Sequence, residues 1–272
     1  MTRAPAPAKL NLALVVGGPR PEGKHEVATV LQRIDLGDRI AIAPAPALAI
    51  DGFAEDTLVR RALEALAAAA GVEPRWRATI SKRTPVAAGL GGGSSDAATA
   101  LRLANATLER PVPAGDLHAL AASLGSDVPF FLAEGPQLGR GDGSELTPLD
   151  LPQDYWVLLL LPHGAAKPST AAIYEAFDER SGDNGARERF AALDAALAGV
   201  RRPRDLAALP PNDLASSPAA DELRELGAFR ADVSGAGPIV YALFHHRQAA
   251  AAARKAMSSR GQTWLTVPVW YA

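Results

Sequence analysis

The sequence predicts a mixed protein of helices and strands in two lobes, of the α/β or α+β class. Strand-like and helix-like segments alternate along the chain, with connections of mixed length and no internal repeat. A length of 272 residues is more than one compact core usually contains, and it is enough for two domains of ordinary size. A glycine-rich stretch at 135–146 closes the first half, so we place the domains at residues 1–150 and 151–272.

The composition points to a small-molecule partner. Apolar residues make up 48% of the chain and charged residues 21%, as in ordinary soluble globular proteins. The net charge of -2 gives no electrostatic reason to expect nucleic acid or an anionic membrane as the main partner. The chain has no cysteine, no secretory signal pattern and no apolar run near the roughly 20 residues that span a bilayer. We therefore expect a cytoplasmic protein.

The first elements follow from alternation and turn residues. Residues 9–16 alternate as a strand, which places Lys9 and Asn11 on one side, about 6.6 Å apart along it. Glycines and prolines at 17–23 predict a loop that presents Lys24 and His25. A turn at 35–38 should lead into a second strand.

The remaining elements are predicted from apolar residues that alternate in strands or recur every three to four residues in helices. Strands are expected at 39–43, 75–81, 156–161, 239–244 and 263–269. Helices are expected from Asp56 as N-cap to Gly71, then at 97–108, 117–124, 170–177, 187–197, after the cap Ser217, and at 248–257. Gly125 should close its helix in a left-handed conformation, and the link 201–211 should be exposed.

A glycine loop between a strand and a helix predicts a phosphate site. Glycines free the backbone to turn several N–H groups toward one point, and the N-terminus of the following helix favours an anion. Lysine does not follow the last glycine as in a Walker A loop, and Ser94 stands where a dinucleotide fingerprint needs Gly or Ala. The predicted phosphate-binding residues are Pro85, Val86, Ala87, Ala88, Gly89, Leu90, Gly91, Gly92, Gly93, Ser94 and Ser95.

Asp127 is the clearest candidate for a functional carboxylate. It lies between the end of a helix and the apolar run that begins at Pro129. A carboxylate in such a position is costly to bury unless it has a partner or a function. A turn-capping role is the alternative interpretation.

Three blocks together resemble the motifs of the GHMP kinase superfamily, which includes galactokinase, homoserine kinase and mevalonate kinase. They are the segment 5–12 with Ala8-Lys9-Leu10-Asn11, the glycine loop, and Ser234-Gly235-Ala236-Gly237. The resemblance implies an α+β fold in two lobes. An ATP-binding N-terminal lobe at 1–150 would resemble the second domain of ribosomal protein S5, and a C-terminal lobe at 151–272 would be ferredoxin-like.

Further segments are similar to the branch of this superfamily that phosphorylates a cytidylated methylerythritol for isoprenoid biosynthesis. They are Gly23-Lys24-His25-Glu26, 34–38, 124–131 and Asn212-Asp213-Leu214. The resemblance implies a kinase that transfers the ATP γ-phosphate to the 2-hydroxyl of the methylerythritol moiety, with Mg²⁺ bridging the phosphates. It implies no nucleic-acid or membrane partner, and we expect a monomer or weak homodimer.

The same resemblance implies roles for single residues. Asp127 would be the base and Lys9 its cationic neighbour, while Asn11, His25 and Asp127 would contact the acceptor. The loop from Pro85 to Ser95 would bind ATP, and the hydroxyl of Ser94 or Ser95 is a candidate ligand for Mg²⁺.

Three positions depart from the pattern of that branch. Lys24 stands where a tyrosine is usual, Leu31 replaces a frequent aromatic, and Thr57 replaces an asparagine that contacts adenine. A kinase of another small alcohol is therefore an alternative. A non-catalytic nucleotide-binding module is disfavoured because both Lys9 and Asp127 are present, and an RNA-binding protein is disfavoured by the near-neutral charge.

Overall fold

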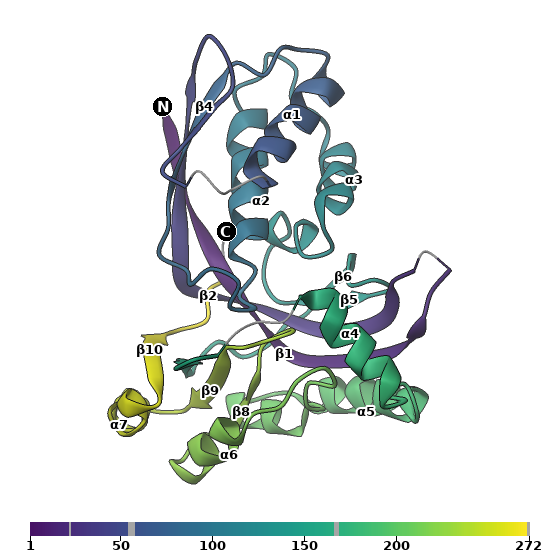
Figure 1. Ribbon diagram of the computed structural model, residues 1–272, viewed down its shortest axis with the longest axis vertical. Coiled ribbons are helices and arrows are strands. Elements are labelled where there is room, and N and C mark those ends of the chain that lie inside the picture. Colours follow the sequence, from purple (N-terminus) through teal and green to yellow (C-terminus); the bar gives the residue numbers. More distant parts are fainter. Residues whose placement is uncertain (22, 54–57, 166–168, 271–272) are drawn as a thin grey trace.

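The computed structural model describes residues 1–21, 23–53, 58–165 and 169–270, and it has two lobes that share one long hairpin (Figure 1). The hairpin consists of β1 (Thr2–Pro19) and β2 (His25–Pro44), paired antiparallel. The predicted N-cap Asp56, and Thr57 at the position of the usual adenine-contacting asparagine, lie outside the described residues.

The hairpin is longer than the sequence predicts. β1 continues through Gly17 and Gly18, so the connection to β2 is shorter than the predicted loop. The predicted turn at 35–38 is wrong, because β2 runs on through it. Pro7 pairs with Gly37 and Ala8 with Ile34, so β2 accommodates two extra residues there as a bulge.

The N-terminal lobe is a sheet covered by helices. In the described part of the chain the strand order is β3-β4-β2-β5-β6, with β1 on β2. The further strands are β3 (Ala49–Asp51), β4 (Trp76–Ser81), β5 (Gln137–Arg140) and β6 (Glu145–Pro148). The helices α1 (Leu58–Ala70), α2 (Gly92–Asn105) and α3 (Ala114–Leu124) lie together beside this sheet (Figure 1).

Apolar periodicity decides which faces meet in this lobe. β4 alternates, with Trp76, Ala78 and Ile80 buried and the residues between them more exposed, as predicted. α1 buries Leu63 and Leu66 on its inner side, and they pack in the same core as β4. The hydrophobic face of the sheet thus packs against the helical layer.

The C-terminal lobe is a second sheet of order β10-β7-β9-β8 with helices around it. Its strands are β7 (Trp156–Pro162), β8 (Arg230–Val233), β9 (Val240–Phe244) and β10 (Gly261–Thr266). Its helices are α4 (Thr170–Glu179), α5 (Ala186–Gly199), α6 (Pro218–Glu225) and α7 (Arg247–Ala256).

Strand β7 shows how this sheet joins the hairpin. Val157 and Leu159 point to the core that contains Leu10 and Leu12 of β1, whereas Leu158 points to the opposite core under α6 and α7. A strand buried on both faces reads as a continuous apolar run, as 156–161 does. β1 and β2 therefore supply hydrophobic surface to both lobes.

The sequence and structure agree on most helices and differ at three connections. Gly125 is extended, with φ 165°, rather than left-handed. Residues 135–146 are not a plain loop, because β5 and β6 pair there as a hairpin. The link 201–211 is not fully exposed, since Leu206 and Leu209 are buried.

The C-terminal segment returns to the N-terminal lobe. The N–H of Asp35 donates to the carbonyl of Val267 at 2.9 Å, and that of Val269 donates to Arg33 at 3.0 Å. The predicted division at 150/151 falls between β6 and β7. Among the helices of the described residues, none is both long and apolar enough to cross a membrane.

Arg33 of β2 is fully buried and holds the segment that follows the candidate base. Its guanidinium donates to the carbonyls of Phe130, Ala133 and Gly135, and it lies 4.3 Å from the centre of the Phe130 ring. Burial, followed by the charge of Arg102, lowers the pKa of Arg33 to about 10. The guanidinium still carries its charge at neutral pH, and three carbonyls depend on it.

We expect Arg33→Met to lower the free energy of unfolding by about 2 to 4 kcal/mol, because buried carbonyls would lose their donors. Urea denaturation monitored by circular dichroism measures the change. Arg39→Met on the same strand is the matched control, since Arg39 is exposed and should move stability by less than about 0.5 kcal/mol. Equal losses for the two variants would contradict this account.

Candidate active site

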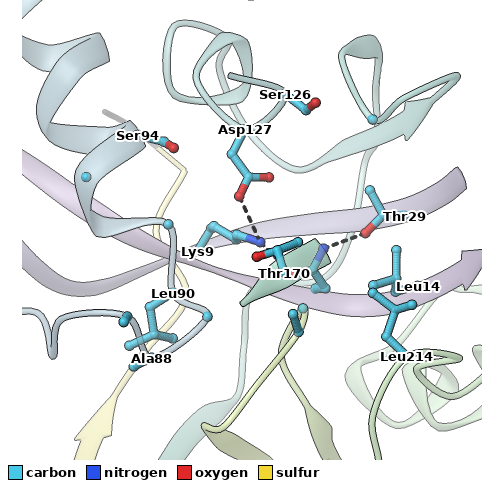
Figure 2. Close-up of a pocket in the computed structure, with 18 of the residues that line it drawn as sticks. Lys9, Leu14, Thr29, Ala88, Leu90, Ser94, Ser126, Asp127, Thr170 and Leu214 are labelled. Carbon is cyan, nitrogen blue, oxygen red and sulfur yellow. Dashed lines mark hydrogen bonds and ion pairs between the residues drawn. The ribbon is translucent and has the colours of Figure 1, made fainter. Parts of the chain in front are cut away.

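A cleft of about 870 Å³ lies where the shared hairpin, the glycine loop and α4 meet. Its walls include residues 85–94, Lys9 and Asn11 of β1, the turn with Ser126 and Asp127, and residues of α4 from Thr170 to Asp178. Figure 2 shows side chains from these separate elements facing one another. The folding of both lobes is therefore needed to form one site.

Lys9 and Asp127 point toward each other at the centre of the cleft (Figure 2). The Lys9 Nζ lies 3.3 Å from the Asp127 Oδ2. The Lys9 side chain is 5% exposed, whereas that of Asp127 is 40% exposed. The carboxylate is therefore open to a ligand from the cleft, while the ammonium approaches it from the protein side.

Lys9 is held in place by a chain of polar contacts. Its Nζ donates to the Asn11 Oδ1 at 2.6 Å, and the Asn11 Nδ2 donates to the Thr29 Oγ1 at 2.7 Å. The Thr29 hydroxyl donates in turn to the carbonyl of Ala13 at 2.8 Å. The same-side placement of Lys9 and Asn11 on the strand is as the alternation predicts. This network fixes the direction of the lysine side chain.

Backbone geometry explains the glycines of the loop. Gly89 has φ +86°, and a Cβ there would lie 2.5 Å from the carbonyl oxygen of Ser234. Gly91 has φ +67° and precedes α2 as its N-cap, and a Cβ there would lie 2.9 Å from the Lys9 side chain. Only glycine suits both conformation and space at these two positions.

The glycine loop is bound to both lobes. The N–H of Lys9 donates to the carbonyl of Leu90 at 2.9 Å, from the N-terminal hairpin. The N–H of Ile239 donates to Ala88 at 3.2 Å, and the Ser234 hydroxyl donates to Gly89 at 3.2 Å, both from the C-terminal lobe. The loop conformation is thus set by contacts from two sides.

The start of α2 offers unpaired donors to the cleft. The first three N–H groups of the helix, on Gly92, Gly93 and Ser94, have no partner within it. A Cβ on Gly93 would meet no protein atom within 4 Å. This arrangement of N–H groups at the positive end of a helix is suited to phosphate oxygens.

Ser95, the last residue of the predicted phosphate-binding stretch, is placed differently from Ser94. Its N–H donates to the carbonyl of Gly91 at 2.9 Å as the first bond of the helix. Its side chain is fully buried and does not line the cleft, whereas Ser94 does. Because a helix turns about 100° per residue, neighbouring serines point to different sides, and only Ser94 faces the ligand space.

Comparison with known proteins identifies the family. The model of the GHMP kinases N terminal domain matches residues 57–135, and that of the GHMP kinases C terminal domain matches residues 180–263. The chain belongs to the GHMP kinase family. The predicted α+β fold of two GHMP kinase lobes is confirmed.

Individual relatives are similar over nearly the whole of this kinase. It is 40% identical to the 4-diphosphocytidyl-2-C-methyl-D-erythritol kinase of Anaeromyxobacter sp. (strain Fw109-5), covering 93% of this chain and 85% of the relative. It is 39% identical to the enzyme of the same name from Deinococcus radiodurans, covering 95% and 89% of the two chains.

Solved structures agree with these matches. A crystal structure of 4-(cytidine 5'-diphospho)-2C-methyl-D-erythritol kinase superposes with a TM-score of 0.79 at 31% identity, covering 98% of this chain and 99% of the other. A mevalonate kinase superposes with a TM-score of 0.74 at 13% identity, over 98% and 99% of the chains, which shows a shared fold alone.

Aromatic side chains form one wall of the kinase cleft. The His25 ring lies 4.7 Å from that of Tyr174, and its Nε2 is 2.8 Å from the Asp178 Oδ1. Burial, followed by the charge of Asp127, raises the pKa of Tyr174 to about 12. Tyr174 and Asp178, which lie one helical turn apart on α4, line the cleft without any local sequence pattern that predicts it. Leu31, in contrast, is buried in the N-terminal core and does not line the cleft.

Lys82 also lines the cleft, together with Lys9 and Lys24, although no local sequence pattern predicts it. Its Nζ lies 2.6 Å from the Asp38 Oδ2 and 2.9 Å from the Asp96 Oδ2, and both carboxylates are fully buried. Burial acts to lower the pKa of Lys82, but the two carboxylates outweigh it and raise the pKa. Asp38 also accepts N–H groups of Arg83 and Thr84, which fixes the chain that enters the glycine loop.

Alanine substitutions should distinguish Gly89, where the fold requires glycine, from Gly93, where it does not. We expect Gly89→Ala to lower the free energy of unfolding by about 1 to 3 kcal/mol, because of its positive φ and the contact with Ser234. Gly93→Ala should leave stability unchanged or raise it by about 0.5 to 1 kcal/mol, since alanine favours the helix. Thermal unfolding measures both, and an unaffected Gly89→Ala protein would contradict the described loop conformation.

Proposed function

We propose that this kinase transfers the γ-phosphate of ATP to the 2-hydroxyl of 4-diphosphocytidyl-2-C-methyl-D-erythritol in the methylerythritol phosphate route to isoprenoids. The observation that supports it most is the pairing of Lys9 with Asp127 beside the glycine loop, in a chain whose relatives carry that name. An ATP-dependent kinase is the coarser statement, and it follows from the family.

Asp127 is proposed as the base. Its carboxylate is 40% exposed to the cleft, so an acceptor hydroxyl can reach it, orient on it and give up its proton as the new P–O bond forms. The Lys9 ammonium, 3.3 Å away, compensates the negative charge of this carboxylate.

Lys9 has a second proposed task. Phosphoryl transfer depends mainly on positioning and on compensating the charge of the transferring oxygens. The Lys9 side chain lies beside the glycine loop as well as Asp127, because a Cβ at Gly91 would lie 2.9 Å from its Cγ and 3.2 Å from its Cε. Asn11 keeps one amide hydrogen and one lone pair free of its bonds to Lys9 and Thr29, which can orient a substrate hydroxyl.

The glycine loop and the start of α2 are proposed to hold the ATP phosphates, with Mg²⁺. Ser94 fits as the protein ligand of the ion, because its hydroxyl faces the cleft next to the free N–H groups. Within the described residues no group of three or more His, Asp or Glu could hold a metal ion, and Mg²⁺ usually takes few protein ligands besides phosphate oxygens. The ion would neutralise phosphate charge.

The aromatic wall is proposed to take the cytosine. His25 and Tyr174 offer ring faces and polar edges at the cleft surface, and stacking contributes on the order of 1 to 3 kcal/mol per base. A kinase of another small alcohol is the second candidate, because Lys24 stands where the tyrosine of this branch is usual. Since the reaction consumes ATP, we also propose that the enzyme acts in the cytoplasm, as a monomer or weak homodimer.

Asp127→Asn tests the base. We expect kcat to fall by about 10²- to 10⁴-fold while the dissociation constant of ATP stays within about twofold, because the base is lost and the phosphate loop is kept. Coupled ADP release and equilibrium ATP titration measure the two quantities. Asp116→Asn on exposed α3 is the control. A variant at position 127 that keeps most of its turnover would remove Asp127 from this role.

A substrate panel tests the acceptor. We expect ADP release with ATP, Mg²⁺ and 4-diphosphocytidyl-2-C-methyl-D-erythritol, and none with methylerythritol that lacks the cytidine diphosphate group. Turnover of an uncytidylated alcohol in preference would establish the second candidate. Omission of Mg²⁺ with a chelator should abolish turnover with either acceptor.

A further inference from the structure

The acceptor side of the cleft contains an ion pair that the proposed chemistry does not use. Lys24, in the turn between β1 and β2, pairs through its Nζ with the Asp142 carboxylate in the turn between β5 and β6. Its Nζ also lies 3.4 Å from the Ser126 hydroxyl, and all three residues line the cleft. The pair therefore joins two hairpin tips beside Asp127.

Stability does not account for this pair. The Lys24 side chain is 53% exposed, and exposed ion pairs contribute little to the folded state. Asp142 also accepts from the Ser126 hydroxyl at 3.2 Å, the Ser144 N–H at 3.1 Å and the Ser144 hydroxyl at 2.6 Å. The carboxylate would therefore remain satisfied if Lys24 moved away.

Charge shows what Lys24 can bind. Among the described residues that line the cleft, the lysines are Lys9, Lys24 and Lys82. Lys9 is committed to Asp127, and Lys82 lies between two buried carboxylates. Lys24 is the cation with a flexible, exposed side chain. Its partner Ser126 directly precedes Asp127, so the ammonium lies beside the turn that carries the proposed base.

We propose that Lys24 is a specificity residue that binds the diphosphate of the acceptor, exchanging Asp142 for it. This inference rests on the proposed function for the identity of the acceptor. An ammonium is a strong donor to phosphate oxygens, and charge-assisted bonds of this kind are stronger than neutral ones. Asp142 would hold Lys24 over the cleft until a diphosphate arrives, and its carboxylate would then compete with that ligand.

Three cytidine compounds test this proposal without turnover. We would titrate cytidine, CMP and CDP calorimetrically into the protein with the nucleotide site saturated by a non-hydrolysable ATP analogue. Lys24→Gln should raise the dissociation constant of CDP by about ten- to hundredfold, as expected for one lost charge-assisted contact. The dissociation constant of cytidine should stay within about twofold of the wild-type value. Equal weakening of cytidine and CDP would overturn the proposal, because Lys24 would then contact the base.

Asp142→Asn gives a prediction of opposite sign. Loss of the competing carboxylate should tighten CDP binding by about three- to tenfold, with cytidine unchanged. If Asp142→Asn instead weakens CDP binding, the Lys24–Asp142 pair only holds the two turns together, and the proposal that Lys24 exchanges Asp142 for the diphosphate is wrong. Arg140→Gln is the matched control, since it breaks the Arg140–Asp194 pair of the same hairpin outside the cleft lining, and all three affinities should stay unchanged.

These binding measurements can fail or succeed independently of the proposed phosphorylation reaction. If the wild-type enzyme phosphorylates the cytidylated acceptor, but the Lys24→Gln variant binds CDP as tightly as the wild type, this inference is overturned and the proposed function stands. A protein that binds CDP through Lys24 without phosphorylating that acceptor would support the diphosphate contact and contradict the proposed substrate.

Discussion

The β1–β2 hairpin is the constraint on which the rest of the structure depends. Its apolar side chains belong to the cores of both lobes, so neither lobe can shift without moving the strand that carries Lys9. The backbone of that same residue donates to Leu90 in the glycine loop. One strand therefore fixes the Lys9 ammonium, the glycine loop and, through Asn11, the polar network beside them.

A second constraint on this site is the cost of burying the Lys9 ammonium away from water. A lysine that is 5% exposed is tolerated only with partners, and Asn11 and Asp127 provide them. The Asp127 side chain is 40% exposed, and the segment that follows it in the chain is anchored by the buried Arg33. Rigid support behind an accessible carboxylate would suit the role of base proposed for Asp127, because phosphoryl transfer depends mainly on positioning.

Local patterns in the sequence were enough to predict the strand with Lys9 and Asn11, the glycine loop and the helix that follows it. These features depend on alternation, helical spacing and glycine conformations, which are properties of short segments. Tyr174, Lys82 and Asp142 were missed, because each reaches the cleft from an element whose position is set by tertiary packing. Ser95 was assigned to the phosphate site because the sequence does not show where a helix begins, and a shift of one residue turns a side chain away.

The shared hairpin also bears on how the chain folds. A fragment with residues 1–150 alone would leave Leu10, Leu12 and Val30 without the second sheet that covers them. Exposed apolar surface of that kind favours association over independent folding. Because the two lobes share these side chains, we expect them to unfold together on heating, in a single transition.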